Sequence, residues 1–189
     1  MIPTMGTLAP TWTLRLARAE DIPALESLIE LSVRESLSRC YSPAQLAAAL
    51  GPVFGVDRQL IRDGTYFVVE EKSAIVACGG WSKRRAVYGG DREREGQDAE
   101  LNPATDAARV RAFFVHPQSE RRGIGRKLLE ASEAAIRAAG FNRVELAATL
   151  AGEGLYAKFG YSVAERYDAP MPGGLAIAVV RMTKDLGHS

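Results

Sequence analysis

The chain has 189 residues, with 24 lysines and arginines, 23 aspartates and glutamates, and a formal net charge of +1. This length is enough for one domain with a buried core. The balanced charge excludes a general binder of nucleic acid or membrane surfaces, so we predict neither kind of partner. Residues 1–10 lack the basic start and apolar run of a signal peptide, and no segment approaches the roughly 18 apolar residues of a membrane span. We expect a cytoplasmic protein with a flexible segment at residues 1–10 and a single domain over residues 11–189.

The first 50 residues predict a strand followed by two helices. Residues 12–17 alternate polar and apolar side chains, as a half-buried strand does. Glu20-Asp21-Ile22-Pro23 is typical of a helix start, with an acidic cap and a proline in the first turn. Ser42-Pro43 begins a second helix that runs to Leu50.

Residues 51–64 show no clear period, and a hairpin follows them. Residues 65–70 and 74–81 are strand-like runs around a tight polar turn, which predicts an antiparallel pair. Residues 83–106 are dense in charge of both signs and have no period, so we predict a long surface loop that is either functional or disordered. Cys40 and Cys78 have neither metal nor disulfide spacing. We predict that both are small core residues of a protein in a reducing compartment.

The centre of the chain reads as a strand, a basic glycine turn and a helix. Val110 to Val115 is a short apolar run closed by Pro117, and Gly123-Ile124-Gly125 opens a helical apolar stripe that ends at Gly140. This order directs free backbone N–H groups and the positive end of a helix dipole at one spot, next to basic side chains. It predicts a site for a phosphate-bearing ligand.

The last part of the chain completes a mixed sheet. Residues 143–149 predict a strand parallel to the central one, because a single helix makes the crossover. A short helix over 154–160 and strands over 161–165 and 176–182 follow. The fold class is α/β: one domain with a central mixed sheet and helices on both faces.

The glycine turn has three alternative interpretations. Gly123 and Gly125 alone fit an ordinary tight turn. A dinucleotide fold would place its acidic residue near Glu145, but Leu128 stands where the third glycine should be. A P-loop is excluded because no Gly-Lys-Ser/Thr follows.

The turn and the strand before it resemble the acyl-coenzyme A motif of the GNAT superfamily of N-acetyltransferases, R/Q-x-x-G-x-G/A. The two glycines match, although Glu120 stands at the R/Q position. The resemblance implies the GNAT fold, acetyl-coenzyme A as cosubstrate and no metal. It implies that backbone amides from Arg121 to Arg126 hold the pyrophosphate, and that the strand backbone pairs with the pantetheine arm. The implied coenzyme-binding residues are Phe113, Phe114, Val115, Arg121, Arg122, Gly123, Ile124, Gly125 and Arg126.

Tyr156 lies in a segment similar to the family's F-Y-x-x-x-G-F, where the tyrosine protonates the leaving thiolate. The chemistry suits a phenol, which stays protonated at neutral pH. Ala151-Gly152 replaces a common family asparagine, and the frequent general-base position holds Arg109. The remaining candidates for the base are Glu70, Glu71, Glu145 and Asp106.

The acceptor site is the least defined part. Trp81, Tyr88 and Phe54 are candidates for its wall, and Arg84-Arg85 for attracting an acidic acceptor. The predicted function is transfer of an acetyl group from acetyl-coenzyme A to a primary amine of a small molecule or peptide. A catalytically weak acyl-coenzyme A-binding module and a protein N-acetyltransferase stay open as alternatives. Resemblance also suggests a homodimer.

Overall fold

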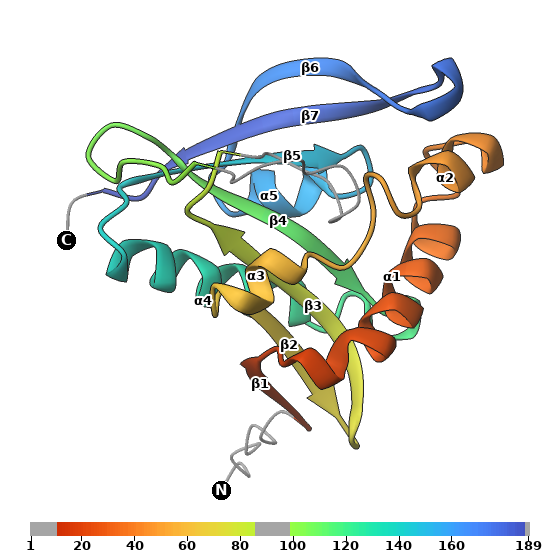
Figure 1. The fold of residues 1–189 in the computed structure, drawn as a ribbon, viewed down its shortest axis with the longest axis horizontal. Helices are drawn as coiled ribbons and strands as arrows, with labels where there is room; N and C mark the ends of the chain where they lie inside the picture. Colours follow the sequence, from red (N-terminus) through yellow and green to blue (C-terminus); the bar gives the residue numbers. More distant parts are fainter. Residues whose placement is uncertain (1–10, 86–98, 188–189) are drawn as a thin grey trace, which may run out of the picture.

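Within residues 11–85 and 99–187, which the computed structural model describes, a seven-stranded mixed sheet forms the centre of the molecule (Figure 1). Its strand order is β1-β2-β3-β4-β5-β7-β6. The strands are β1 (Trp12–Leu16), β2 (Tyr66–Glu71), β3 (Ala74–Ser82), β4 (Ala108–Val115), β5 (Arg143–Thr149), β6 (Ser162–Pro170) and β7 (Ala176–Asp185). The predicted flexible segment at residues 1–10 lies outside the described residues.

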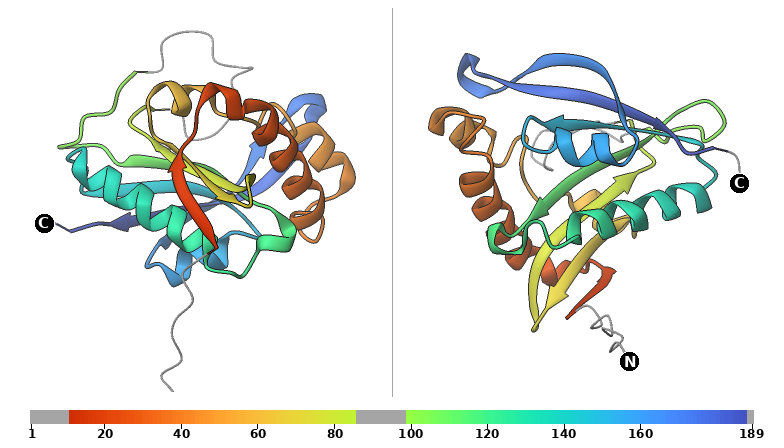
Figure 2. Two further views of the ribbon diagram at one scale, coloured as in Figure 1. Left: turned by 90° about the horizontal axis from the view of Figure 1, so that it is seen from below. Right: turned by 180° about the vertical axis from the view of Figure 1, so that it is seen from behind.

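Helices cover both faces of the sheet, which confirms the predicted fold class. They are α1 (Ile22–Ser36), α2 (Pro43–Ala49), α3 (Arg58–Arg62), α4 (Ile124–Ala138) and α5 (Glu153–Lys158), with 3₁₀ turns η1 (Ala19–Asp21), η3 (Pro117–Ser119) and η4 (Pro172–Gly174). Figure 2 shows α4 and α5 on the face opposite α1 and α3. We call the α1 and α3 side the front face and the α4 and α5 side the back face. None of the helices in the described part of the chain is long and apolar enough to span a membrane.

Local sequence explains where the main helices begin and end. Ser42 caps α2 by accepting a hydrogen bond from the backbone N–H of Gln45, whose side chain bonds back to the Ser42 N–H. α4 buries a stripe that includes Ile124, Leu128 and Ile136. Gly140 then ends this helix with a left-handed φ of 86°.

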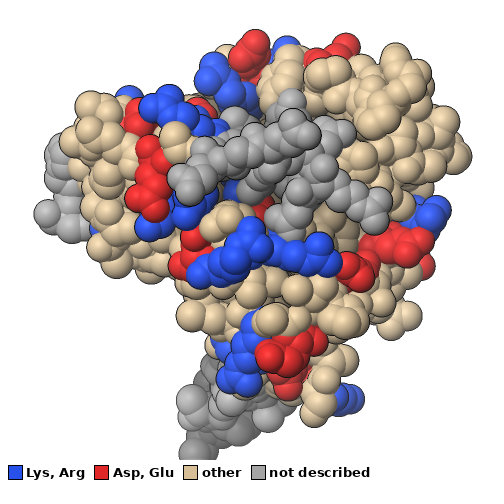
Figure 3. All heavy atoms as spheres, viewed as in Figure 1, with Lys and Arg blue, Asp and Glu red and all other residues tan. Residues whose placement is uncertain are grey.

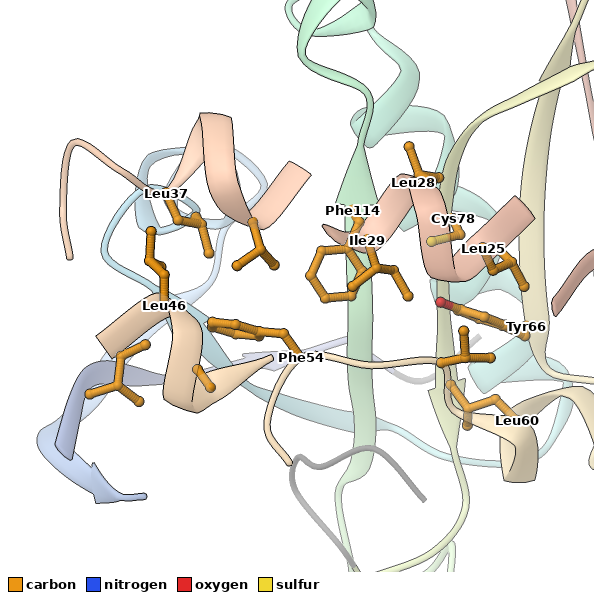
Figure 4. Packing of buried hydrophobic residues seen from close by; sticks show 14 of the residues in the cluster. Leu25, Leu28, Ile29, Leu37, Leu46, Phe54, Leu60, Tyr66, Cys78 and Phe114 are labelled. Carbon is orange, nitrogen blue, oxygen red and sulfur yellow. The ribbon is translucent and has the colours of Figure 1, made fainter. Parts of the chain in front are cut away.

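The front core lies between α1 and the sheet (Figure 4). Leu25, Ile29 and Tyr66 are buried there, and Phe54 meets Phe114 edge-on with ring centroids 6.1 Å apart. Each fully buried leucine or isoleucine contributes about 1.5–3 kcal/mol. This cluster therefore fixes the α1 layer, and the segment that leads from α2 to α3, against β3 and β4.

The central strands pair over only a short distance. β4 and β5 are parallel, as predicted, but are in register only at Ala108↔Val144 and Arg109↔Glu145. An ion pair between Arg109 and Glu145 joins them at this closed end. Beyond it β5 continues alongside β7. The sheet is therefore split between β4 and β5.

The hairpin prediction is confirmed: β2 and β3 are antiparallel, and Lys72 and Ser73 at the turn both have positive φ. The final strands are longer than predicted, because β6 continues to Pro170 as an exposed edge strand without an apolar alternation. The structure also adds α3, whose five residues are too few to show a period.

Two other predictions need correction. Cys40 is exposed rather than part of the core, whereas Cys78 is buried as predicted. The ends of the predicted 83–106 loop are packed, since Leu101 is buried and Arg84 forms a bridge to Glu100. Residues 86–98 of that loop lie outside the described part of the chain.

Candidate active site

A cleft of about 180 Å³ lies where β4 and β5 separate. The segment between α2 and α3 lines its front, and α4 and α5 line its back through Gly125, Leu155 and Tyr156. β4 and β5 form the side walls with residues 110–115 and 147–149. The cleft therefore passes through the sheet, so two molecules can meet in it from opposite faces.

A β-bulge interrupts β4 in the wall of this cleft. The register with β3 shifts between Cys78 and Gly80, so Ala112 and Phe113 both oppose Gly79. Ala112 has a φ of 59°, in the left-handed region that a side chain makes costly. The Phe113 ring lies against Gly79, where an added Cβ would come within 2.6 Å of it. A side chain at position 79 would therefore displace Phe113.

The edge of β4 that faces the split has no strand partner among the described residues after Arg109. Phe113, Phe114 and Val115 lie on this stretch and line the cleft. A strand edge without a neighbour offers backbone N–H and C=O groups to an added extended partner. These residues can thus pair with an arm that carries amide groups.

The turn before α4, which was predicted to hold the pyrophosphate, lies at the back of the molecule and has backbone features that suit an anion. Arg121 and Gly123 have φ values of 59° and 80°, and no side chain caps the helix that begins at Ile124. The first N–H groups of a helix have no partner within it and lie at the positive end of its dipole. Gly125 belongs to this first turn and also lines the cleft.

The predicted arginines do not all face this spot. Arg122 binds both carboxylate oxygens of Glu71 at 2.8 and 2.6 Å, and this pairing lowers the pKa of Glu71 to about 2. Arg126 contacts Glu130 at 2.7 Å and lies over the Phe159 ring. Arg121 forms no ion pair with any residue that the structure describes. The groups that this turn offers to an anion are therefore mainly backbone N–H groups.

Glu120, which stands at the arginine or glutamine position of the motif, turns away from the anion site. Its carboxylate accepts a hydrogen bond from the Ser36 hydroxyl at the end of α1. An acidic side chain there would repel a phosphate, and this contact directs it toward α1 instead.

Tyr156 lies at the back of the cleft on α5. It is buried, and its ring meets Phe113 and Tyr161 with centroids 6.3 and 5.7 Å away. Burial raises the pKa of the Tyr156 phenol above its ordinary value, so the hydroxyl is protonated at neutral pH. A protonated phenol can act as a proton donor.

A comparison with family models decides the assignment. Residues 62–163, just over half of the chain, match the model described as an acetyltransferase (GNAT) domain. The chain belongs to the GNAT acetyltransferases. The matched range contains the split, the bulge, the turn before α4 and Tyr156.

Solved structures of GNAT proteins share this fold at low sequence identity. A GCN5-related N-acetyltransferase from Rhodopseudomonas palustris is 20% identical, with a TM-score of 0.66 over 95% of this chain and 99% of that one. The PaiA N-acetyltransferase from Thermoplasma acidophilum, solved with coenzyme A, is 13% identical, with a TM-score of 0.62 and coverages of 93% and 99%. A GNAT acetyltransferase from Brucella melitensis, solved with acetyl-coenzyme A, is 16% identical, with a TM-score of 0.57 and coverages of 94% and 89%. No curated protein matches the sequence.

The four carboxylates predicted as general bases do not line the cleft of this GNAT domain. Glu70 pairs with Arg15, and Glu71 with Arg122. Glu145 lies in the ion pair at the closed end, and Asp106 accepts a hydrogen bond from the Asn102 N–H. Each is held by a partner away from the space where an amine would attack.

The structure brings a different pair of charges into the cleft. Asp57 and Arg111 both line it, are almost completely buried, and form an ion pair with Nε and Oδ2 2.8 Å apart. Asp57 also accepts a hydrogen bond from the Leu60 N–H and thereby caps α3. The sequence offered one signal for this position, because aspartate is among the residue types favoured at a helix N-cap.

Of the predicted acceptor-wall aromatics, Phe54 lines the cleft. Trp81 packs against Phe141 in the back core, and Tyr88 lies outside the described residues. Arg84 binds Asp63 at 2.8 Å rather than facing an acceptor. On the face seen in Figure 3, basic and acidic side chains of the described residues lie intermixed. Among the described residues that line the front of the cleft, the side chains are apolar apart from the Asp57–Arg111 pair.

Proposed function

We propose that this GNAT enzyme transfers the acetyl group of acetyl-coenzyme A to a primary amine by direct attack on the thioester. The observation that carries the proposal is the cleft through the sheet, with the anion site and Tyr156 at its back and Asp57 at its front. Reactants that enter from opposite faces can form a bond inside the split without an acyl-enzyme intermediate.

The coenzyme is assigned to the back face and the open edge of β4. The backbone N–H groups of Ile124, Gly125 and Arg126 would hold the pyrophosphate, with Arg121 beside them. The amide groups of the pantetheine arm would pair with Phe113 to Val115, as an added strand pairs with a sheet edge. This arrangement directs the thioester toward the bulge.

The acceptor is assigned to the front face. Asp57 is the one carboxylate lining the cleft among the described residues, so it would attract an ammonium group to the site of attack. The ammonium proton would pass to Asp57, directly or through a water molecule, before the free amine attacks.

The reaction then needs a group that stabilises the oxyanion and a group that donates a proton to the sulfur. The amine nitrogen bonds to the thioester carbon, and the carbonyl electron pair moves to oxygen, where the Phe113 N–H at the bulge would stabilise it. As the tetrahedral species collapses, the carbon–sulfur bond breaks. The Tyr156 hydroxyl would donate its proton to the departing sulfur. The nitrogen, which becomes positively charged on attack, would lose its second proton to the Tyr156 phenolate, directly or through a water molecule, and this restores the hydroxyl.

A thiol-release assay with a panel of primary amines tests this proposal, together with mass spectrometry of the acceptor. Transfer at the amine, with a product heavier by one acetyl group, is the expected result. Tight acetyl-coenzyme A binding without thiol release for any amine would instead favour the acyl-coenzyme A-binding module.

A further inference from the structure

The bulge that carries the Phe113 N–H is held in place by two buried donors from neighbouring strands. The Tyr66 hydroxyl donates to the carbonyl oxygen of Ala112 at 3.2 Å, and the Cys78 thiol approaches the same oxygen at 3.9 Å. Figure 4 shows the Tyr66 oxygen and the Cys78 sulfur both pointing toward β4. Two side chains from β2 and β3 therefore converge on one peptide group of β4.

This peptide group is the one that needs external support. Ala112 has a φ of 59°, a region in which a non-glycine residue is strained. The free energy that one hydrogen bond contributes is comparable with the cost of this strain. The bond from Tyr66 is thus large enough to decide whether the bulge keeps this conformation.

Peptide geometry links the carbonyl to the proposed oxyanion donor. In a trans peptide the C=O of one residue and the N–H of the next point in opposite directions, and the described chain has no cis peptide bond. Because the Ala112 carbonyl points to Tyr66 and Cys78, the Phe113 N–H points away from them. Neither Tyr66 nor Cys78 lines the cleft, whereas Ala112 and Phe113 do.

Both donors keep their hydrogens under working conditions. Burial raises the pKa of Tyr66 well above its ordinary value and that of the Cys78 thiol to about 12. Tyr66 is completely buried in the front core, so solvent does not compete for its hydroxyl. Both groups therefore stay protonated at neutral pH, and the contact is a fixed part of the fold.

We propose that Tyr66 is a positioning residue, whose hydroxyl, assisted by Cys78, sets the direction of the Phe113 N–H toward the thioester oxygen. The inference rests on the proposed acetyl transfer. Tyr66 touches neither reactant and acts through the Ala112–Phe113 peptide. Its loss would therefore weaken the stabilisation of the oxyanion and leave the pyrophosphate site intact.

The test compares wild type with Tyr66→Phe, which removes only the hydroxyl. Thr65→Val is the matched control, because its buried hydroxyl bonds the Leu60 carbonyl rather than the bulge. Three quantities are measured: kcat for thiol release, the affinities for coenzyme A and acetyl-coenzyme A by calorimetry, and the infrared band of bound acetyl-coenzyme A labelled with ¹³C at the carbonyl.

We expect Tyr66→Phe to lower kcat by about ten- to a hundredfold, below the 10²–10³-fold effect of removing an oxyanion donor outright. Its coenzyme A affinity should match wild type, while the labelled carbonyl band should move back toward its frequency in free acetyl-coenzyme A. Thr65→Val should keep the wild-type band and kcat. A Tyr66→Phe enzyme with the wild-type band and kcat would overturn the inference while leaving acetyl transfer established. A wild-type protein that neither binds nor transfers the acetyl group would overturn the proposed function instead.

A second pair of variants covers the case in which Tyr66→Phe alone does not fold. Glycine adopts a φ of 59° without strain, so Ala112→Gly makes the bulge less dependent on its donors. Adding Tyr66→Phe to Ala112→Gly should therefore reduce kcat by less than about tenfold relative to Ala112→Gly alone. A larger loss in the double variant would show that Tyr66 does not act through the bulge.

Discussion

Replacing Tyr156 with phenylalanine removes one hydroxyl from the back of the cleft and keeps the ring that fills it. The contacts of this ring with Phe113 and Tyr161, at 6.3 and 5.7 Å between centroids, need no hydroxyl. Because burial raises the pKa of the phenol, it is a weak acid that gives up its proton only as the thiolate forms. The variant should therefore fold normally and be impaired in one step of catalysis.

The size of the effect follows from the leaving group. Positioned acid catalysis contributes about 10²–10⁴-fold, and a thiol with a pKa of about 8.5 leaves fairly well unaided. We expect Tyr156→Phe to lower kcat by about a hundredfold, equivalent to about 2.7 kcal/mol of activation free energy. The KM for acetyl-coenzyme A should hardly change, because the contact is made chiefly in the transition state.

Steady-state thiol release with the best amine of the panel measures this loss, and thermal melting checks the fold. Tyr161→Phe is the matched control, because it removes a neighbouring hydroxyl that does not line the cleft. With its raised pKa, Tyr156 stays protonated through pH 9, so the wild-type kcat should show no alkaline decline from this group. Unchanged kcat in Tyr156→Phe would show that the hydroxyl is not the proton donor.

Three further predictions concern the proposed anion site and two ion pairs. Gly125→Asp should abolish coenzyme binding in calorimetry while the fold survives, since an acidic residue suits the first turn of a helix; Gly125→Ala separates the effect of charge from that of bulk. Arg122 lowers the pKa of Glu71, so this ion pair stabilises the fold above about pH 4.5, and the stabilisation is lost as the pH falls to about 2. The free energy of unfolding of Glu71→Gln should therefore fall less than that of wild type over this pH range. Arg111→Met should lower the free energy of unfolding, measured with urea, by about 3–5 kcal/mol, because it leaves the buried Asp57 carboxylate without its cation. Adding Asp57→Leu should restore much of this free energy.

The strand, turn and helix around the proposed anion site could be predicted from sequence because their determinants are local. A strand, a turn with Gly123 and Gly125, and an amphipathic helix follow one another within residues 110–140, and each has its own signal. The structure places these elements as predicted. The basic side chains were harder to predict, because the partner of Arg122 is Glu71 on a distant strand.

The rest of the cleft depends on contacts that the sequence pattern does not encode. Ala112 is an alanine in a conformation that favours glycine, so its residue type gives no sign of a bulge. The nearest sign lies in the partner strand, where Gly79 and Gly80 interrupt an apolar run. Asp57 lies in a segment without periodicity, and only the packing of α3 brings it to Arg111. Such residues are found from register and packing rather than from spacing.

The proposed oxyanion donor and the proposed proton donor come from opposite sides of the split, so the split itself controls their separation. Phe113 belongs to β4, whereas Tyr156 lies on the helix that follows β5. β4 and β5 are joined in register only at the closed end, where Arg109 pairs with Glu145. A change at that end would alter the angle between the strands and move the oxyanion donor relative to the proton donor. Strain at Ala112 affects only the first of these groups, because it turns one peptide and leaves β5 in place. Substitutions at the two places should therefore have different effects. A substitution at the bulge should alter the stabilisation of the acetyl carbonyl alone, whereas one at the closed end should also alter proton donation to the leaving thiolate.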